Sequence, residues 1–242
     1  MPAIDLSSLE QKLSSINGQA IRDTFVGDNE FLAIENFLPE DLTEKLIAEL
    51  NKLEHVVHRN FIPKHKKGGS VSRFDLDKHA ACFRDLYEFK PLIDFFSFLA
   101  DRSLLQCPHD DPHTYALYYY TEPGDHIGYH YDTSYYQGAR YTVLVGLVDN
   151  SSCKLECQLH KDDPDRTTET VKVRLTPGKL VFFNGDKLYH RITPLGANER
   201  RIALTLEYLT SNKMHPWHRF ISNMKDAIAY FGFKQVFGLG KN

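Results

Sequence analysis

The sequence has few cysteines and no long apolar run. Only four of its 242 residues are cysteine, and no two of them have CxxC spacing. Sparse cysteines of this kind are typical of reduced thiols in a cytosolic protein, so we expect no disulfide framework. No apolar run reaches the roughly 18 residues that a membrane-spanning helix needs. Residues 1–17 include Asp5, Glu10 and Lys12, where a signal peptide would have an uninterrupted apolar core. We therefore expect a cytoplasmic protein without a membrane segment.

An excess of positive charge is also missing. The 29 Lys and Arg residues face 32 Asp and Glu residues, which gives a formal net charge of -3. General attraction to nucleic acid or to anionic membranes is therefore not expected. Hydrophobic residues make up 42% of the chain and charged residues 25%, which is enough apolar surface for a folded core. The length suits one β-barrel or β-sandwich domain with attached helices.

The first half of the chain combines helices with a short strand. Apolar residues at helical spacing predict helices over residues 40–53 and 83–105, and a short helix is expected over 5–16. Residues 30–37 are expected to form a strand. The segment 64–70 is polar and contains Gly68 and Gly69, so we interpret it as a loop, with the two glycines as hinges if it closes as a lid.

From residue 114 onward the pattern changes to short β-rich runs separated by turn residues. Strands are predicted over residues 114–121, 140–148, 170–175, 179–183 and 201–209. Strands at this spacing are typical of a sandwich or barrel. A helix is expected over residues 216–239. We therefore expect a single domain over 1–242, mainly β with flanking helices, in which 1–113 support a β core at 114–209 and 210–242 form a C-terminal helix.

The residues best suited to chemistry are two histidines and an aspartate. His130 and Asp132 are two apart, so in an extended segment both side chains project from one face. His190 follows a predicted strand and can supply a third ligand if the β fold brings it near. Two histidines and one carboxylate form the facial site of non-haem Fe(II) oxygenases. A rival zinc pair, His126 and His130 on a helix, is disfavoured by the glycines at positions 124 and 128.

Alternation along the strand 201–209 places one arginine on a polar face. Ile202, Leu204 and Leu206 share one face, whereas Arg201, Ala203, Thr205 and Glu207 share the other. A face of small and polar groups suits a ligand cavity better than a packed layer. A guanidinium there can bind a carboxylate in bidentate fashion, while Arg200 would point to the outer face.

These residues resemble the iron- and 2-oxoglutarate-dependent oxygenases, whose motif is His-x-Asp, a distant His and a basic residue about ten positions later. The resemblance spans roughly residues 114–209 and includes Tyr120, Arg140-Tyr-Thr-Val-Leu144 and His190-Arg-Ile-Thr-Pro194. It implies a double-stranded β-helix (jelly-roll, cupin-like) core and the use of Fe(II), 2-oxoglutarate and O2. It further implies that His130, Asp132 and His190 bind iron. Arg201 would bind the distal carboxylate of 2-oxoglutarate, with a hydrogen bond from Tyr120.

Two further segments, residues 58–72 and Tyr129-His-Tyr-Asp-Thr-Ser-Tyr-Tyr136, resemble the branch that acts on free amino acids. That branch includes radical halogenases of lysine-like substrates and their hydroxylating relatives. In the halogenases a glycine replaces the carboxylate ligand and leaves a position for chloride. Asp132 departs from that pattern and would occupy the position, so the resemblance implies hydroxylation of L-lysine or a similar basic amino acid.

Binding an amino acid with a cationic side chain requires a guanidinium for its carboxylate and acidic or polar groups for its ammonium ions. Candidates for these roles are Arg73, Glu122, Thr133 and Glu207. Other functions remain open: the same chemistry on a peptidyl side chain or an alkylated base, a metal-dependent isomerase or a dioxygenase that needs no oxoacid, or a non-catalytic metal-binding jelly roll. The sequence leaves the oligomeric state open.

Overall fold

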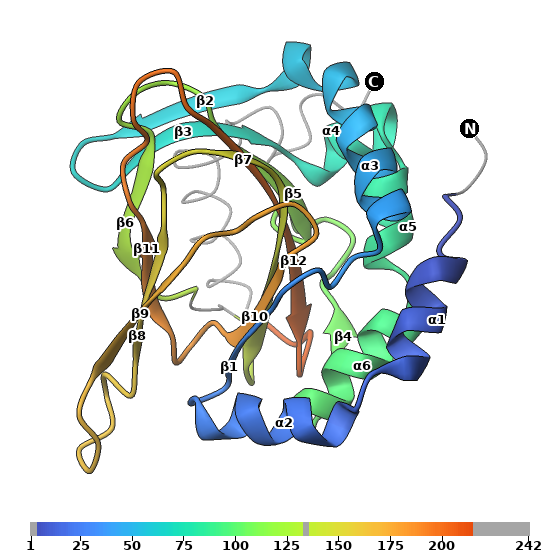
Figure 1. The fold of residues 1–242 in the computed structure, drawn as a ribbon, viewed down its shortest axis with the longest axis vertical. Coiled ribbons are helices and arrows are strands. Elements are labelled where there is room, and N and C mark those ends of the chain that lie inside the picture. The colour runs from blue at the N-terminus through green and yellow to red at the C-terminus, as the bar shows by residue number, and fades with distance from the viewer. Residues whose placement is uncertain (1–3, 133–135, 215–242) are drawn as a thin grey trace.

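A computed structural model of the chain describes residues 4–132 and 136–214. Helices occupy mainly the first hundred residues of this part, and strands occupy most of the remainder (Figure 1). The helical elements are α1 (Ser7–Ser15), α2 (Gly18–Gly27), α3 (Glu40–Glu49), α4 (Arg73–His79), α5 (Cys82–Tyr87), α6 (Lys90–Ala100) and the 3-10 turns η1 (Leu50–Lys52) and η2 (Glu54–Val56). None of the described helices is both long and apolar enough to cross a membrane.

The strands form one largely antiparallel sheet that curls into a nearly closed barrel (Figure 1). They are β1 (Phe31–Ile34), β2 (His58–Ile62), β3 (Lys66–Val71), β4 (Leu105–Gln106), β5 (Tyr115–Tyr120), β6 (His126–His130), β7 (Arg140–Asn150), β8 (Leu155–Leu159), β9 (Glu169–Val173), β10 (Leu180–Asn184), β11 (Tyr189–Ile192) and β12 (Arg200–Leu209). Their order is β1-β10-β7-β12-β5-β3-β6-β11-β8-β9, with β2 added beside β3 and β4 beside β12. The expectation of a mainly β fold with flanking helices is confirmed.

Alternating side chains give the barrel wall two apolar faces. On β12, Leu204 and Leu206 belong to a buried cluster that includes residues of the flanking helices, such as Leu46 of α3 and Phe96 of α6. Ala203, the neighbour of Leu204, belongs instead to a second buried cluster, together with apolar residues of β8, β10 and β11. The helices therefore cover one side of the wall (Figure 1), and the second cluster fills part of the barrel interior.

The loop predicted over residues 64–70 is correct only for residues 64 and 65, which lie in a turn, because Lys66–Val71 is strand β3 inside the sheet. This strand pairs with β2, β5 and β6. A Cβ atom on Gly69 would lie 2.6 Å from Cγ1 of Val57 and 3.2 Å from Cβ of Tyr119. Glycine is therefore required here for close packing, which explains a strand in a segment that lacks strand-forming residues. Gly68 and Gly69 thus lie within a paired strand and not in a hinge loop.

Other elements differ in detail. The helix predicted over 83–105 is two helices, α5 and α6, separated by Phe89 in an extended conformation. Pro91 lies in the first turn of α6, where its missing N–H is tolerated, so the helix restarts before it. Helices α2 and α4 and the strands β2, β4, β6, β8 and β11 were not predicted. The predicted helix at 216–239 lies outside the described residues.

Candidate active site

Two neighbouring strands bring the predicted metal-binding histidines together. In the antiparallel pair β6 and β11, His130 lies directly opposite His190, and their ring centroids are 4.3 Å apart. Asp132 follows two residues after the end of β6. Its Oδ1 lies 3.3 Å from Nε2 of His130, and its Oδ2 lies 3.7 Å from Nε2 of His190. One ligand atom from each of the three residues lies within 4.8 Å of the other two, as a shared metal ion requires.

Backbone carbonyls fix the orientation of both imidazoles. Nδ1 of His130 lies 2.8 Å from the carbonyl oxygen of Gly128, and Nδ1 of His190 lies 3.0 Å from that of Leu188. A carbonyl only accepts, so each Nδ1 carries the proton and each Nε2 keeps its lone pair. Burial lowers the pKa of His190 to about 4, so this ring is neutral at neutral pH. Both Nε2 atoms are thus ready to bind a metal.

Asp132 is held by contacts on three sides. Its N–H donates to the carbonyl of Gly185 at 3.0 Å, and Oγ1 of Thr142 donates to its Oδ2 at 2.9 Å. A Cβ on Gly185 would lie 2.8 Å from Cβ of Asp132, so only glycine permits this approach. Burial alone would raise the pKa of Asp132, but neighbouring groups, among them the positive charge of Arg140, hold it well below its usual range. The carboxylate is therefore ionised.

The donor set fits Fe(II). Two imidazole nitrogens and one carboxylate oxygen are the ligands of the facial triad, whereas zinc clusters favour thiolates. Cys157 of β8 lies opposite His190 in the sheet, but burial raises the pKa of its thiol far above its usual range, so it stays protonated. The described residues thus offer a nitrogen and oxygen site.

Arg201 and Tyr120 lie opposite each other on β12 and β5. The Arg201 guanidinium lies 4.9 Å from the centroid of the Tyr120 ring, and only 2% of the residue is exposed. Within residues 4–132 and 136–214 no carboxylate forms an ion pair with it. Burial raises the pKa of Tyr120 to about 12, so its hydroxyl stays a donor. By contrast, Arg200 forms an ion pair with Glu54 at 3.0 Å on the other face.

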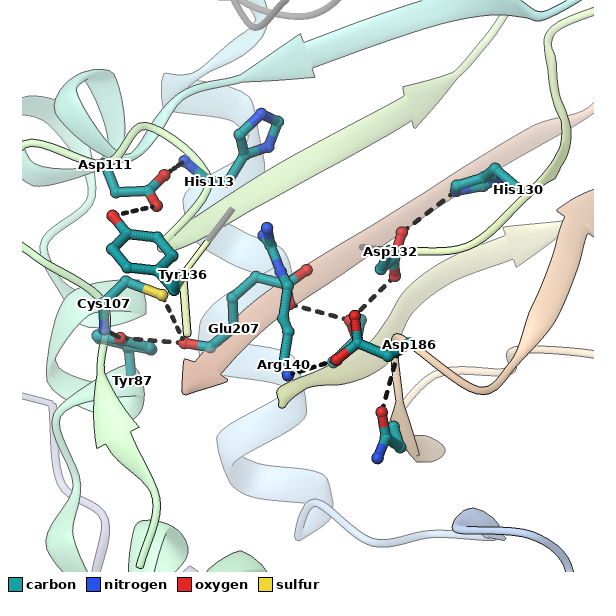
Figure 2. Close-up of polar contacts among 12 residues, drawn as sticks. Tyr87, Cys107, Asp111, His113, His130, Asp132, Tyr136, Arg140, Asp186 and Glu207 are labelled. Carbon is teal, nitrogen blue, oxygen red and sulfur yellow. Dashed lines mark hydrogen bonds and ion pairs between the residues drawn. The ribbon is translucent and has the colours of Figure 1, made fainter. Parts of the chain in front are cut away.

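A buried polar network connects Asp132 to the opposite wall (Figure 2). Thr142 Oγ1 lies 2.9 Å from Asp132 Oδ2 and also 2.9 Å from Glu207 Oε2. Nε of Arg140 donates to the same Glu207 oxygen at 2.9 Å. Burial, opposed by Arg140, raises the pKa of Glu207 to about 7. The hydroxyl of Thr142 has one proton for two carboxyl groups, and a protonated Glu207 resolves the conflict by donating to Thr142.

The sequence was compared with the profiles of known protein families and with curated proteins. The sequence profile of the family called Halogenase D matches residues 14–139, which is more than half of the chain. The chain belongs to the Halogenase D family. No curated protein matches the sequence significantly.

Solved structures share the fold of this Halogenase D family member at low sequence identity. The epimerase SnoN from nogalamycin biosynthesis aligns with a TM-score of 0.66 and 16% identity, over 79% of this chain and 80% of SnoN. A prolyl hydroxylase from Trichoplax adhaerens, in complex with a hypoxia-inducible factor peptide, aligns with a TM-score of 0.66 and 16% identity, over 86% of this chain and 94% of the hydroxylase. A prolyl-4-hydroxylase from Pseudomonas putida aligns with a TM-score of 0.59 and 18% identity, over 79% of this chain and 97% of that enzyme. The jelly-roll core is confirmed by this likeness.

The structure separates the four predicted substrate residues. Glu207 lies in the network beside Asp132, as described above. Arg73 is buried, and its Nη2 contacts Asp77 at 3.2 Å and His109 at 2.5 Å. Glu122 is half exposed and forms ion pairs with Arg59 and Lys67. Among the described residues, neither Arg73 nor Glu122 contacts a member of the triad. Thr133 lies outside the described residues.

The sequence analysis assigned no role in the site to three further polar residues of the barrel. Arg140 and Thr142 share one face of β7, and their spacing of two residues was the available signal. Lys66 is buried on β3, and its Nζ lies 5.1 Å from the centroid of the Tyr118 ring. Burial lowers the pKa of this lysine well below its usual range. The sequence analysis did not identify Lys66 as a barrel residue because its segment was interpreted as a loop.

Proposed function

We propose that this chain is an Fe(II)- and 2-oxoglutarate-dependent hydroxylase of a free amino acid, with L-lysine or a similar basic amino acid as the substrate. The observation that carries the proposal is the combination of two features in one barrel. A nitrogen and oxygen triad suits Fe(II), and the buried guanidinium of Arg201 has no carboxylate partner among the described residues. A buried unpaired cation is costly, and an anionic cosubstrate would offset that cost.

Each residue then has a role. His130, Asp132 and His190 would hold the metal through Nε2, a carboxylate oxygen and Nε2. Arg201 would bind the distal carboxylate of 2-oxoglutarate, and the Tyr120 hydroxyl beside it would donate a hydrogen bond. When bound, iron and the oxoacid would supply, with O2, the oxidising power to insert an oxygen atom into a C–H bond. The protein fixes the distance and orientation of the substrate.

The proposal of hydroxylation rather than halogenation rests on Asp132. Its carboxylate is ionised, is fixed by Thr142 and by the Gly185 backbone, and points at both imidazoles. It therefore would fill the position that a halide would need. Halogenation of a substrate by this chain would require Asp132 to leave the metal.

Aerobic incubation of the iron-loaded protein with 2-oxoglutarate and each free amino acid tests the proposal. We expect succinate together with a product heavier by one oxygen atom, first of all with L-lysine. Succinate formation stimulated by peptides but by no free amino acid would favour the second candidate, a peptidyl hydroxylase. That candidate is supported by the fold likeness to a prolyl hydroxylase in complex with a peptide. Absence of any oxoacid turnover would contradict both.

A further inference from the structure

Arg140 has an unusual environment for a buried arginine. It begins strand β7, and its side chain is 13% exposed. Its Nε donates to Oε2 of Glu207 at 2.9 Å. Within the described part of the chain, its two terminal nitrogens, Nη1 and Nη2, have no hydrogen-bond or ion-pair partner. A guanidinium has five N–H donors, so most of the hydrogen-bonding capacity of this side chain is unused.

Side-chain contacts connect the guanidinium of Arg140 to the candidate metal site. Three successive contacts of 2.9 Å lead from Asp132 to Thr142, then to Glu207 and to Arg140. Figure 2 shows Arg140 and Glu207 between Asp132 on one side and the hydrogen-bonded pair Asp111 and Tyr136 on the other. The guanidinium of Arg140 and the carboxyl group of Glu207 are therefore connected to the side chain of Asp132 through Thr142.

This guanidinium is separate from the one assigned to the cosubstrate. Arg201 and Glu207 lie on one face of β12 but six residues apart, which corresponds to roughly 20 Å along a strand. Arg140 contacts the Glu207 end. A single oxoacid held by Arg201 therefore does not also occupy the position beside Glu207, which leaves Arg140 free for a different carboxylate.

We propose that Arg140 binds the carboxylate of the amino-acid substrate through Nη1 and Nη2, and that Glu207 orients the guanidinium by accepting from Nε. Two parallel N–H donors match the two oxygens of a carboxylate, and a lysine side chain would not reproduce this geometry. This inference rests on the proposed function. It also gives a reason for choosing free amino acids, because a residue within a peptide has an amide where Arg140 needs a carboxylate.

The test compares L-lysine with L-lysinamide, which lacks the carboxylate charge. The wild-type protein is loaded anaerobically with Fe(II) and 2-oxoglutarate, and each compound is titrated while the visible charge-transfer band is followed. The same titrations are made with Arg140→Lys and Arg140→Gln. Arg174→Lys is the matched control, since Arg174 is half exposed and forms an ion pair with Asp149 instead. Thermal unfolding of every variant checks the fold, and Arg140→Lys keeps a positive charge at this position.

We expect the wild type to bind L-lysine at least about tenfold more tightly than L-lysinamide, the size of a lost charge-assisted contact. Arg140→Lys and Arg140→Gln should weaken L-lysine binding and reduce this preference, while Arg174→Lys should keep it. The inference is overturned if folded Arg140 variants retain the full preference, or if Arg73→Lys removes it instead. A wild-type protein that forms no band at all would contradict the proposed function rather than the role of Arg140.

Discussion

Replacing Thr142 with valine removes the hydroxyl that lies between two carboxyl groups while keeping a β-branched side chain in strand β7. The hydroxyl donates to Asp132 Oδ2 at 2.9 Å, and this bond leaves Oδ1 available to the metal. A hydrogen bond to a charged group contributes about 1.5–3 kcal/mol. Loss of a group that orients a metal ligand typically weakens metal binding by about 10- to 100-fold. We therefore expect Thr142→Val to bind Fe(II) at least about tenfold more weakly.

The assay is anaerobic calorimetric titration of metal-free protein with Fe(II), repeated with Mn(II), which resists oxidation. Thr142→Ser keeps the hydroxyl and should bind metal nearly as tightly as the wild type. Thr205→Val is a second control, because Oγ1 of Thr205 is buried without a hydrogen-bond partner among the described residues. Its removal should leave metal affinity unchanged and cost no stability. Equal metal affinity in Thr142→Val and wild type would refute the reasoning.

Three other changes test different parts of the site. Folding raises the pKa of Glu207 from 4.5 to about 7, so the folded metal-free protein holds this proton more tightly than the unfolded chain does. The resulting stabilisation, at most about 3 kcal/mol, is complete below pH about 4.5 and is lost as the pH rises through about 7. Urea unfolding of Glu207→Gln should lack this component, and an unchanged pH dependence would contradict it. Gly185→Ala should weaken metal binding by about tenfold or more, because its Cβ would lie 2.8 Å from that of Asp132, whereas Gly27→Ala, with open space around it, should not. Asp132→Gly should hydroxylate poorly and, with chloride, yield chlorinated product by mass spectrometry; undiminished hydroxylation would count against a carboxylate-closed site.

Local patterns predicted much of the barrel wall. The alternation in residues 201–209 separates Leu204 from Arg201, and the structure places Leu204 against the helices and Arg201 beside Tyr120 on β5. The spacing of His130 and Asp132 likewise predicted that the two side chains lie together, and Oδ1 of Asp132 lies 3.3 Å from Nε2 of His130. These geometric predictions are confirmed because the two-residue period of a strand is a local property.

Contacts between distant segments could not be predicted in the same way. Glu207 depends on Thr142 and Arg140, which precede it by 65 and 67 residues and meet it only because β7 pairs with β12. Strand β3 was assigned to a loop because its glycines favour turns, whereas Gly69 is required by close contacts to Val57 and Tyr119. The strand registers that bring these distant residues into contact depend on how the whole sheet closes, which no local pattern encodes.

The most direct test of the central claim is an anaerobic Fe(II) titration of the metal-free protein in the presence of 2-oxoglutarate. We predict a visible charge-transfer band that saturates at one iron per chain. The band should be absent in His190→Ala, which removes a proposed metal ligand, and should require a much higher oxoacid concentration in Arg201→Met, which removes the guanidinium proposed to bind the oxoacid. A wild-type protein without the band, or a band unchanged in His190→Ala, would contradict the claim that His130, Asp132 and His190 hold one ferrous ion beside an anchored oxoacid.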